Sequence, residues 1–206
     1  ITRPELLTSI HAAYIEAGSD IVYANTFGAS AKKLEGTGHT VEELVPAALE
    51  CARKAAEPAG ALVALDVGPL GELLEPAGTL HFEDAYEYFA QIMRACGDKA
   101  DVIVLETMTD LYEVKAALLA AKENSRLPVM VSMTFEANGR SFTGCTVESF
   151  GVTARGLGAN AVGINCSLGP KEIYPMAKRL AEAVPGDFPV FVKPNAGLPR
   201  ADGSGY

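Results

Sequence analysis

The sequence is poor in several residue types, and each shortage narrows the possible functions. It has no tryptophan, three histidines and 17 lysine and arginine residues against 26 acidic ones, for a formal net charge of −9. Nucleic-acid-binding surfaces are basic, so this balance argues against a nucleic-acid partner. No apolar run is long enough to span a bilayer, and the first residues do not resemble a signal peptide. We therefore expect no membrane association.

The four cysteines are also informative through what they lack. Cys51, Cys96, Cys145 and Cys166 show no CxxC spacing and no density typical of secreted domains. This pattern predicts free thiols in a reducing compartment, and hence a cytoplasmic location. Cys51 and Cys96 fall within helical patterns and are expected to be small buried residues.

Short apolar runs rich in β-branched residues alternate with amphipathic stretches. The runs predict buried parallel strands at Asp20–Ala24, Ala61–Leu65, Val102–Leu105, Val129–Met133, Ala161–Ile164 and Pro189–Val192. The stretches between them predict helices at Pro4–Ala17, Val41–Glu57, Asp84–Gly97, Asp110–Asn124, Val147–Leu157 and Lys171–Val184. Thr40 and Glu43 have the spacing of a capping box at the start of the second helix.

This alternation predicts an α/β fold with right-handed βαβ crossovers. A doubly wound sheet would gather its site at one switch point, whereas here polar or glycine-rich residues follow nearly every strand. That distribution favours a (β/α)₈ TIM barrel, whose site draws on all of its loops. Because the chain opens with a helix and closes just after a strand, we expect residues 1–206 to be one incomplete barrel domain. The alternative is a six-stranded variant fold, and the Gly203–Gly205 run is expected to be a loop.

Two residues at predicted strand ends have clear chemical potential. Cys166, which follows Asn165 directly, can be a metal ligand, a nucleophile or an ordinary buried cysteine. None of the histidines follows a strand, which argues against a cysteine–histidine nucleophilic pair. Glu106 ends an apolar strand, where it can bind a substrate ammonium group or form a buried ion pair with a lysine or arginine of the barrel.

Other strand ends suggest an amino-acid pocket. Asp66 has the same placement as Glu106, and the backbone amides of the loop that includes Gly68 can bind a carboxylate or simply form a tight turn. Asn25 and Thr26 can bind substrate or cap their loop, and Asn195 can offer an amide oxygen to a metal or form a turn. The sequence thus predicts carboxylates for an ammonium group, loop amides for a carboxylate, and sulfur chemistry at Cys166.

Several segments, taken together, resemble a known family. They are HAAYIEAGSDIVYANTFGAS, DVGPLGEL, VIVLETMTDLYEVKAAL, FTGCT, GINCSLGPKEI and KPNAGLP. Their order is similar to that of the homocysteine S-methyltransferase domain, and within that family to the N-terminal homocysteine module of cobalamin-dependent methionine synthases. The resemblance extends essentially from end to end.

The resemblance implies a (β/α)₈ barrel that holds zinc through three cysteines. Cys166 matches the first of these, while the adjacent pair of a GGCC segment has no counterpart in this sequence. Asn195 matches a residue that lies beside the zinc, Glu106 matches the carboxylate that binds the substrate ammonium group, and Asp66–Gly68 match a loop near the substrate. Asn165, which precedes Cys166, is also expected to bind substrate. Lys193 stands where relatives often carry Glu or Gln, and its role is left open.

The implied reaction is transfer of a methyl group to the zinc-bound thiolate of homocysteine, giving methionine. The implied donor is methylcobalamin, with partner modules that bind cobalamin and methyltetrahydrofolate. Alternatives are S-methylmethionine or a betaine as donor, a metal-free binding domain on the same barrel, and a lyase or aldolase, for which Lys193 is the one strand-end lysine.

Overall fold

The structure is a computed structural model that describes residues 2–197. Its strands form one parallel sheet in the order β1-β2-β3-β4-β5-β6. They are β1 (Ile21–Tyr23), β2 (Leu62–Val67), β3 (Val102–Met108), β4 (Val129–Met133), β5 (Ala161–Asn165) and β6 (Val190–Lys193). This sequential order is that of a (β/α) barrel and differs from a doubly wound sheet, in which the strand order reverses. The predicted barrel-type fold is confirmed.

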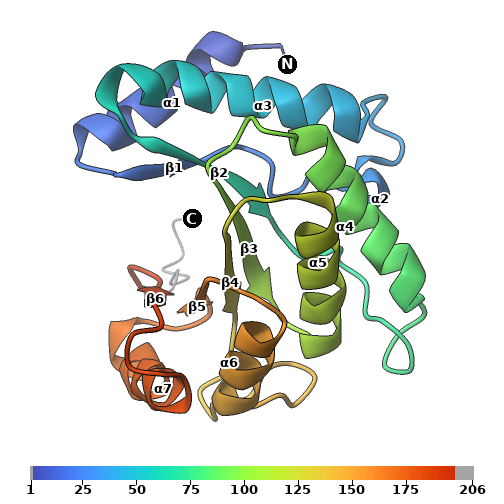
Figure 1. Ribbon diagram of the computed structural model, residues 1–206, viewed down its shortest axis with the longest axis vertical. Coiled ribbons are helices and arrows are strands. Elements are labelled where there is room, and N and C mark those ends of the chain that lie inside the picture. The colour runs from blue at the N-terminus through green and yellow to red at the C-terminus, as the bar shows by residue number, and fades with distance from the viewer. Residues whose placement is uncertain (1, 198–206) are drawn as a thin grey trace, which may run out of the picture.

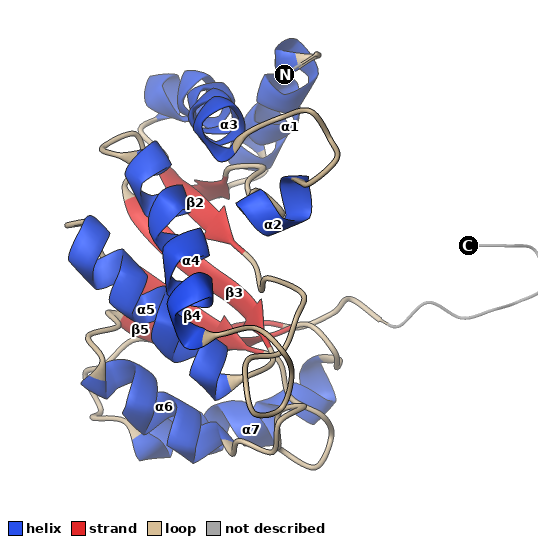
Figure 2. Cartoon of the chain, turned by 90° about the vertical axis from the view of Figure 1, so that its right-hand side faces the viewer, coloured by secondary structure: helices blue, strands red, loops and turns tan. Residues whose placement is uncertain are grey.

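The helices lie outside the curled sheet, as Figures 1 and 2 show. They are α1 (Pro4–Glu16), α2 (Ala31–Leu34), α3 (Val41–Ala56), α4 (Phe82–Cys96), α5 (Leu111–Asn124), α6 (Val147–Gly156) and α7 (Pro170–Ala183), with a 3₁₀ turn η1 (Glu57–Ala59). No helix in the described part of the chain is long and apolar enough to cross a bilayer. The expected loop at Gly203–Gly205 and the last two residues of KPNAGLP lie outside the described residues.

Most helix boundaries agree with the sequence prediction, and two differences have a physical reason. The Thr40 hydroxyl accepts a hydrogen bond from the Glu43 amide and the Glu43 side chain accepts one from the Thr40 amide, each at 3.3 Å, so the capping box is confirmed. Helix α4 begins at Phe82 rather than Asp84, because Asp84 belongs to an acidic first turn instead of capping it. Helix α2, with four residues, is too short to show a helical period.

Alternation along the strands divides the core into two parts. Val63, Leu65 and Leu105 point outward into the large cluster that the helices cover. Ala64 and Val104 point to the concave inner face, where they form a separate small cluster with Val102, Ile21, Tyr23 and Met130. Because successive strand residues alternate between faces, the inner face continues beyond these apolar residues to the polar residues at the carboxyl ends.

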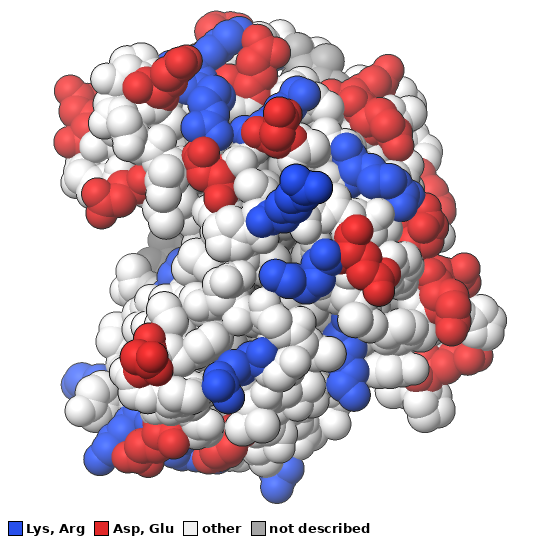
Figure 3. All heavy atoms as spheres, viewed as in Figure 1, with Lys and Arg blue, Asp and Glu red and all other residues white. Residues whose placement is uncertain are grey.

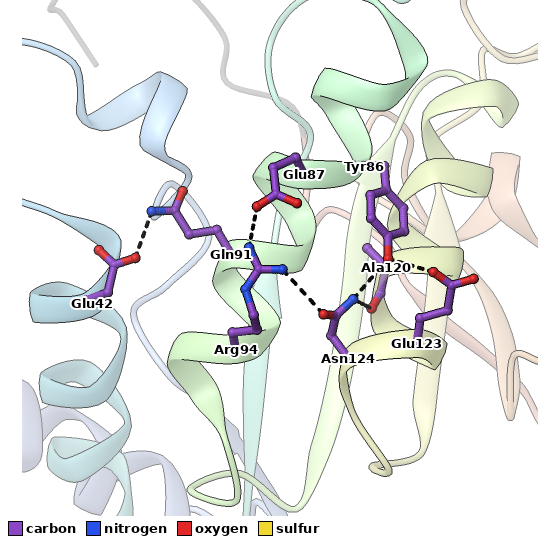
Figure 4. Close-up of polar contacts among 8 residues, drawn as sticks. All are labelled: Glu42, Tyr86, Glu87, Gln91, Arg94, Ala120, Glu123 and Asn124. Carbon is purple, nitrogen blue, oxygen red and sulfur yellow. Dashed lines mark hydrogen bonds and ion pairs between the residues drawn. The ribbon is translucent and has the colours of Figure 1, made fainter.

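Polar contacts join the outer helices where they are exposed. Gln91 of α4 donates to Glu42 of α3 at 2.7 Å, and Arg94 of α4 donates to Asn124 of α5 at 3.4 Å (Figure 4). Exposed contacts of this kind are worth about 0–1 kcal/mol each. They add little stability beyond the burial of the apolar cluster beneath, where for example Phe89 is fully buried.

Candidate functional site

The carboxyl ends of the strands bring a set of polar side chains to the inner face of the sheet. In the strand register Asp66 pairs with Val104 and Asn165 pairs with Lys193. Asp66 therefore lies on the face of the small inner cluster, two residues beyond Ala64, and Asn165 and Lys193 lie on the same face at the ends of β5 and β6. Glu106 follows Val104 on the same face of β3. The strands thus place apolar residues at the bottom of the curl and charged or amide side chains at its mouth.

Glu106 forms an ion pair in this structure, one of the two alternatives that the sequence leaves open. The Lys193 ammonium on β6 binds Oε2 of Glu106 on β3, three strands away in the sheet order. The Lys193 side chain is 38% exposed and the Glu106 side chain 14%. The ammonium also lies 4.2 Å from the ring centroid of Tyr23 on β1. The ion pair therefore spans the inside of the curl between strands that are not neighbours.

These contacts determine the protonation of Lys193. Burial lowers the pKa of Lys193, but its hydrogen bond to Glu106 and the nearby Tyr23 raise it more, so the pKa lies above its usual value. An amine must be neutral to attack a carbonyl group, and a raised pKa keeps this one protonated. The arrangement counts against the lyase or aldolase alternative.

Asp66 lies beside this pair with an unsatisfied oxygen. Burial, followed by the negative charge of Glu106 and opposed by Lys193, raises the pKa of Asp66 to about 8. Its Oδ1 has no hydrogen-bond partner among the residues that the structure describes. A buried acceptor without a partner is costly, and such atoms in a cleft often mark a place where a ligand binds.

Thr26 ties the loop after β1 to β2 and is fully buried. Its hydroxyl donates to the carbonyl oxygen of Asp66 at 2.7 Å and accepts from the Asp66 amide at 3.0 Å. These bonds make Thr26 a support for Asp66. Asn25, by contrast, is exposed and lines the adjoining cavity. A substrate contact of either residue stays a prediction.

A bulge in β3 aims the next residue toward β5. The register shifts between Leu105 and Met108, and Thr107 has a φ of 61°, in the left-handed region. Such a conformation costs roughly 1–2 kcal/mol in a residue other than glycine. Two hydrogen bonds with Asn165 offset the cost: the Thr107 amide donates to Oδ1 at 3.0 Å, and the Thr107 hydroxyl accepts from Nδ2 at 2.8 Å. Bulges beside sites re-aim side chains in this way.

Asn165 also fixes the sulfur of Cys166. Its Oδ1 accepts from the Thr107 amide and from the Ser132 hydroxyl, the latter at 2.8 Å. Because a backbone amide can only donate, the carboxamide orientation is determined, and Nδ2 must face the other way. There it donates to Sγ of Cys166 at 3.2 Å. The sulfur therefore lies at the same mouth as Glu106, which precedes Thr107 in the chain.

Asn195 lies close to Cys166 through the backbone. The Asn195 amide donates to the carbonyl oxygen of Leu168 at 3.0 Å, and the Cys166 amide donates to that of Lys193 at 3.0 Å. The turn after β6 thus runs beside the loop that carries the thiol. Proximity of the two predicted metal-binding residues follows from this pairing, whereas a metal-binding role for Asn195 stays a prediction.

In the loop after β2, two backbone amides already donate to protein acceptors, and a carboxylate contact of this loop stays a prediction. The Gly68 amide donates to the carbonyl oxygen of Phe27 at 3.1 Å, and the Leu70 amide donates to Glu113 at 2.7 Å. Pro69, between them, has no amide hydrogen. A Cβ atom on Gly68 would lie 2.5 Å from the Phe27 ring, so glycine is required here for close packing.

The described residues do not by themselves fit a zinc site. Residues 2–197 contain no group of three or more histidine, cysteine, aspartate or glutamate side chains that could hold a metal. All four cysteines are free, and Cys51 and Cys96 are buried as predicted. Cys145 donates to the carbonyl oxygen of Thr146 at 3.2 Å, and burial raises the pKa of its thiol. Cys166 alone is one ligand where zinc uses three or four protein ligands.

A cavity of about 690 Å³ adjoins the charged cluster. Its polar lining includes Tyr23, Asn25, Asp66 and Lys193, and α1 contributes mostly apolar residues. Figure 3 shows a notch between the part of the molecule that carries α1 and β1 and the part that carries β6 and α7. The volume of the cavity is suited to a small ligand.

Sequence reasoning assigned no role to Tyr23, Thr107 and Ser132 in this mouth, and it left the role of Lys193, the partner of Glu106, open. Strand alternation could have placed Tyr23 and Ser132 on the inner face, since each lies an even number of positions from inner residues of its own run. Nothing local in the sequence indicates the bulge at Thr107.

Known proteins resemble this chain over nearly its whole length. The methionine synthases of Mycobacterium tuberculosis and Mycobacterium leprae are each 32% identical over 213 aligned residues, covering 96% of the chain. The chain spans 17% of the length of those proteins. The metallated form of the homocysteine methyltransferase MmuM from Escherichia coli superposes with a TM-score of 0.84 at 24% identity, covering 96% of this chain and 74% of that one.

The superposition supports the barrel-type fold, and family membership follows from sequence. A family model described as homocysteine S-methyltransferase matches residues 1–206, and the strand-end residues described above lie throughout that match. The chain therefore belongs to the homocysteine S-methyltransferase family.

Proposed function

We propose that the chain forms the homocysteine-binding barrel of a methyltransferase, which transfers a methyl group to the homocysteine thiol and gives methionine. The observation that carries this proposal is the common mouth of Glu106 and Cys166, which Asn165 and Thr107 connect by hydrogen bonds. A carboxylate for an ammonium group and a sulfur ligand at one mouth suit an amino acid that bears a thiol. The residues 1–206 are proposed as one domain of this function.

Each site residue has a proposed role. Glu106 binds the substrate ammonium group, and the unpartnered Oδ1 of Asp66 is a second acceptor for it. Thr26 and Gly68 support the loops on either side of Asp66 through the contacts described above. Asn165 orients the Cys166 sulfur, and Asn25 contacts the ligand from the exposed rim.

Zinc dependence is proposed only for a complete site. Cys166 would be one thiolate ligand with Asn195 beside the metal, and the remaining ligands would come from outside residues 2–197. Zinc, when bound, lowers the pKa of a coordinated thiol so that the thiolate forms near neutral pH. The part of the chain that the structure describes contributes the binding and orientation of the amino acid.

The donor and the partners are also proposed. Methylcobalamin is favoured, because the methionine synthases above are long proteins of which the chain covers 17%, which leaves room for modules that bind cobalamin and methyltetrahydrofolate. S-methylmethionine or a betaine is the alternative donor. The four free thiols support a cytoplasmic location.

The test measures homocysteine binding by isothermal titration calorimetry under reducing conditions. Glu106→Gln is expected to weaken binding about tenfold or more, because one charge-assisted hydrogen bond is lost. The matched control is Glu148→Gln, which breaks another carboxylate ion pair, to Arg179 at 2.6 Å, on the outer helices. Unchanged binding in the Glu106 variant, or an equal loss in the control, would contradict the proposal.

A second measurement separates the enzyme from a metal-free binding domain. Methionine formation from homocysteine and methylcobalamin is followed by mass spectrometry, with zinc content measured in parallel. The enzyme proposal expects turnover that depends on zinc and that Cys166→Ala abolishes. Zinc-independent homocysteine binding, with no turnover in the longest natural form of the protein, would favour the binding domain.

A further inference from the structure

Lys193 occupies a position in the mouth that the proposed function does not use. Its ammonium reaches from β6 across the curl to Glu106 on β3 and to the face of Tyr23 on β1. Its side chain remains 38% exposed, whereas that of Glu106 is 14% exposed. The lysine is thus the more accessible member of the ion pair, and it is the member that lines the cavity.

The carboxylate of an amino-acid ligand needs a partner in this mouth. The amides of Gly68 and Leu70 already donate to protein acceptors. Lys193 is the only lysine or arginine that lines the 690 Å³ cavity among the described residues. A ligand whose ammonium group reaches Glu106 therefore places its carboxylate near a single available strong cation.

We infer that Lys193 binds the carboxylate of the amino-acid substrate while Glu106 binds its ammonium group, so that the Lys193–Glu106 pair opens around a zwitterion. This inference rests on the proposed function and adds a specificity-determining residue to it. One ion pair is exchanged for two, and the net charge of the mouth does not change.

The same exchange predicts weaker binding of half-ligands, which are ligands that carry only the ammonium group or only the carboxylate. An amine without a carboxylate would take Glu106 and leave Lys193 unpaired. An acid without an ammonium group would take Lys193 and leave Glu106 unpaired, although only 14% of that side chain is exposed. Leaving a partly buried charge without its partner is costly, so both half-ligands should bind more weakly than the zwitterion.

The experiment titrates the full chain by calorimetry with three thioethers, which need no metal for binding. They are L-methionine, (methylthio)propylamine, which lacks the carboxylate, and (methylthio)butanoate, which lacks the ammonium group. The wild-type chain should bind methionine about tenfold or more tightly than either, the effect of one partly exposed charged contact. Lys193→Met should weaken methionine binding by about the same factor. The dissociation constants of methionine and of the amine for this variant should then differ by about threefold or less.

Two further variants keep the test decisive. Lys193→Arg should retain the preference for methionine, because the guanidinium also binds a carboxylate. Lys178→Met, which removes an exposed lysine 3.9 Å from Glu182 on α7, should change nothing. If Lys193→Met does not fold, Lys193→Gln replaces it, with the urea midpoint as the check of folding.

The outcomes separate the inference from the proposed function. If Lys193→Met binds methionine as tightly as the wild type or more tightly, Lys193 merely competes for Glu106 and the inference is overturned. If binding is then still sensitive to Glu106→Gln, the proposed function survives. If the wild-type chain binds the amine as well as methionine, the carboxylate has no partner and the inference is wrong. If it binds neither methionine nor homocysteine, both fail.

Discussion

Replacing Asp66 with asparagine is expected to stabilise the folded chain increasingly as the pH rises. The folded-state pKa of Asp66 is about 8, against 3.8 for a solvated aspartate, chiefly because the carboxyl group is buried. Below pH 3.8 the group is protonated in the folded and the unfolded chain, and it carries no penalty. As the pH rises from 3.8 to 8 the unfolded chain loses the proton first, so the free energy of unfolding falls.

The magnitude follows from the difference between the two pKa values. Each pKa unit corresponds to about 1.4 kcal/mol, so the full penalty above pH 8 is about 6 kcal/mol. Between pH 5 and pH 9 the part that develops is about 4 kcal/mol, a large fraction of the stability of a typical domain. Asparagine has no such titration. Its amide adds a constant cost in a buried place, which cancels when the two pH values are compared.

The assay is urea denaturation of wild type and Asp66→Asn at pH 5 and pH 9. The stability of the variant relative to wild type should rise by about 4 kcal/mol between the two conditions. The control is Asp101→Asn. Burial opposes ionisation of Asp101, but Arg53 and the Val63 amide outweigh it and lower its pKa, so the loss of stability in this variant develops in the acid range, and its stability relative to wild type should be the same at pH 5 and pH 9. A relative gain for Asp66→Asn of less than about 1 kcal/mol would refute the reasoning.

Two further predictions concern packing and a second buried carboxyl group. Gly163→Ala should destabilise the chain by about 1–3 kcal/mol in urea denaturation, because the new Cβ would lie 2.6 Å from the carbonyl oxygen of Phe191. The control Gly156→Ala, whose new Cβ would have no atom within 4 Å, should be neutral or slightly stabilising. Equal effects of the two substitutions would contradict the prediction. Burial raises the pKa of Glu113 to about 7, so Glu113→Gln should gain stability relative to wild type as the pH rises from 4.5 through 7, and a flat difference would exclude the shift. Glu113→Leu should instead cost about 1–3 kcal/mol at pH 5, because the Leu70 amide loses its acceptor.

Sequence patterns predicted the parts of the fold that depend on local periodicity. The runs around Val102–Leu105 and Val129–Met133 are strands, and the Thr40–Glu43 spacing is a capping box, because each signal lies within a few residues of the chain. The patterns did not predict helix α2, because its four residues are too few to show a helical period. They also placed the start of α4 at Asp84 instead of Phe82, because acidic residues occur both as helix caps and in first turns.

The residues of the mouth were likewise predicted only in part. Strand ends identified Glu106 and Cys166 as residues of one mouth, because all strands of a parallel sheet end at the same edge. The sequence left two alternatives for Glu106 and could not name its partner, since Lys193 lies 87 positions away in the chain.

The sequence by itself determined the alternation of strands and helices, the family and the set of polar residues at the carboxyl edge. Only the tertiary structure decided how those residues meet: that Lys193 crosses the curl to Glu106, that the bulge at Thr107 turns toward Asn165, and that Asp66 keeps an oxygen without a partner. The reason is physical. Periodicity and capping depend on neighbours along the chain, whereas ion pairing, desolvation and bulge geometry depend on the curvature and register of the whole sheet.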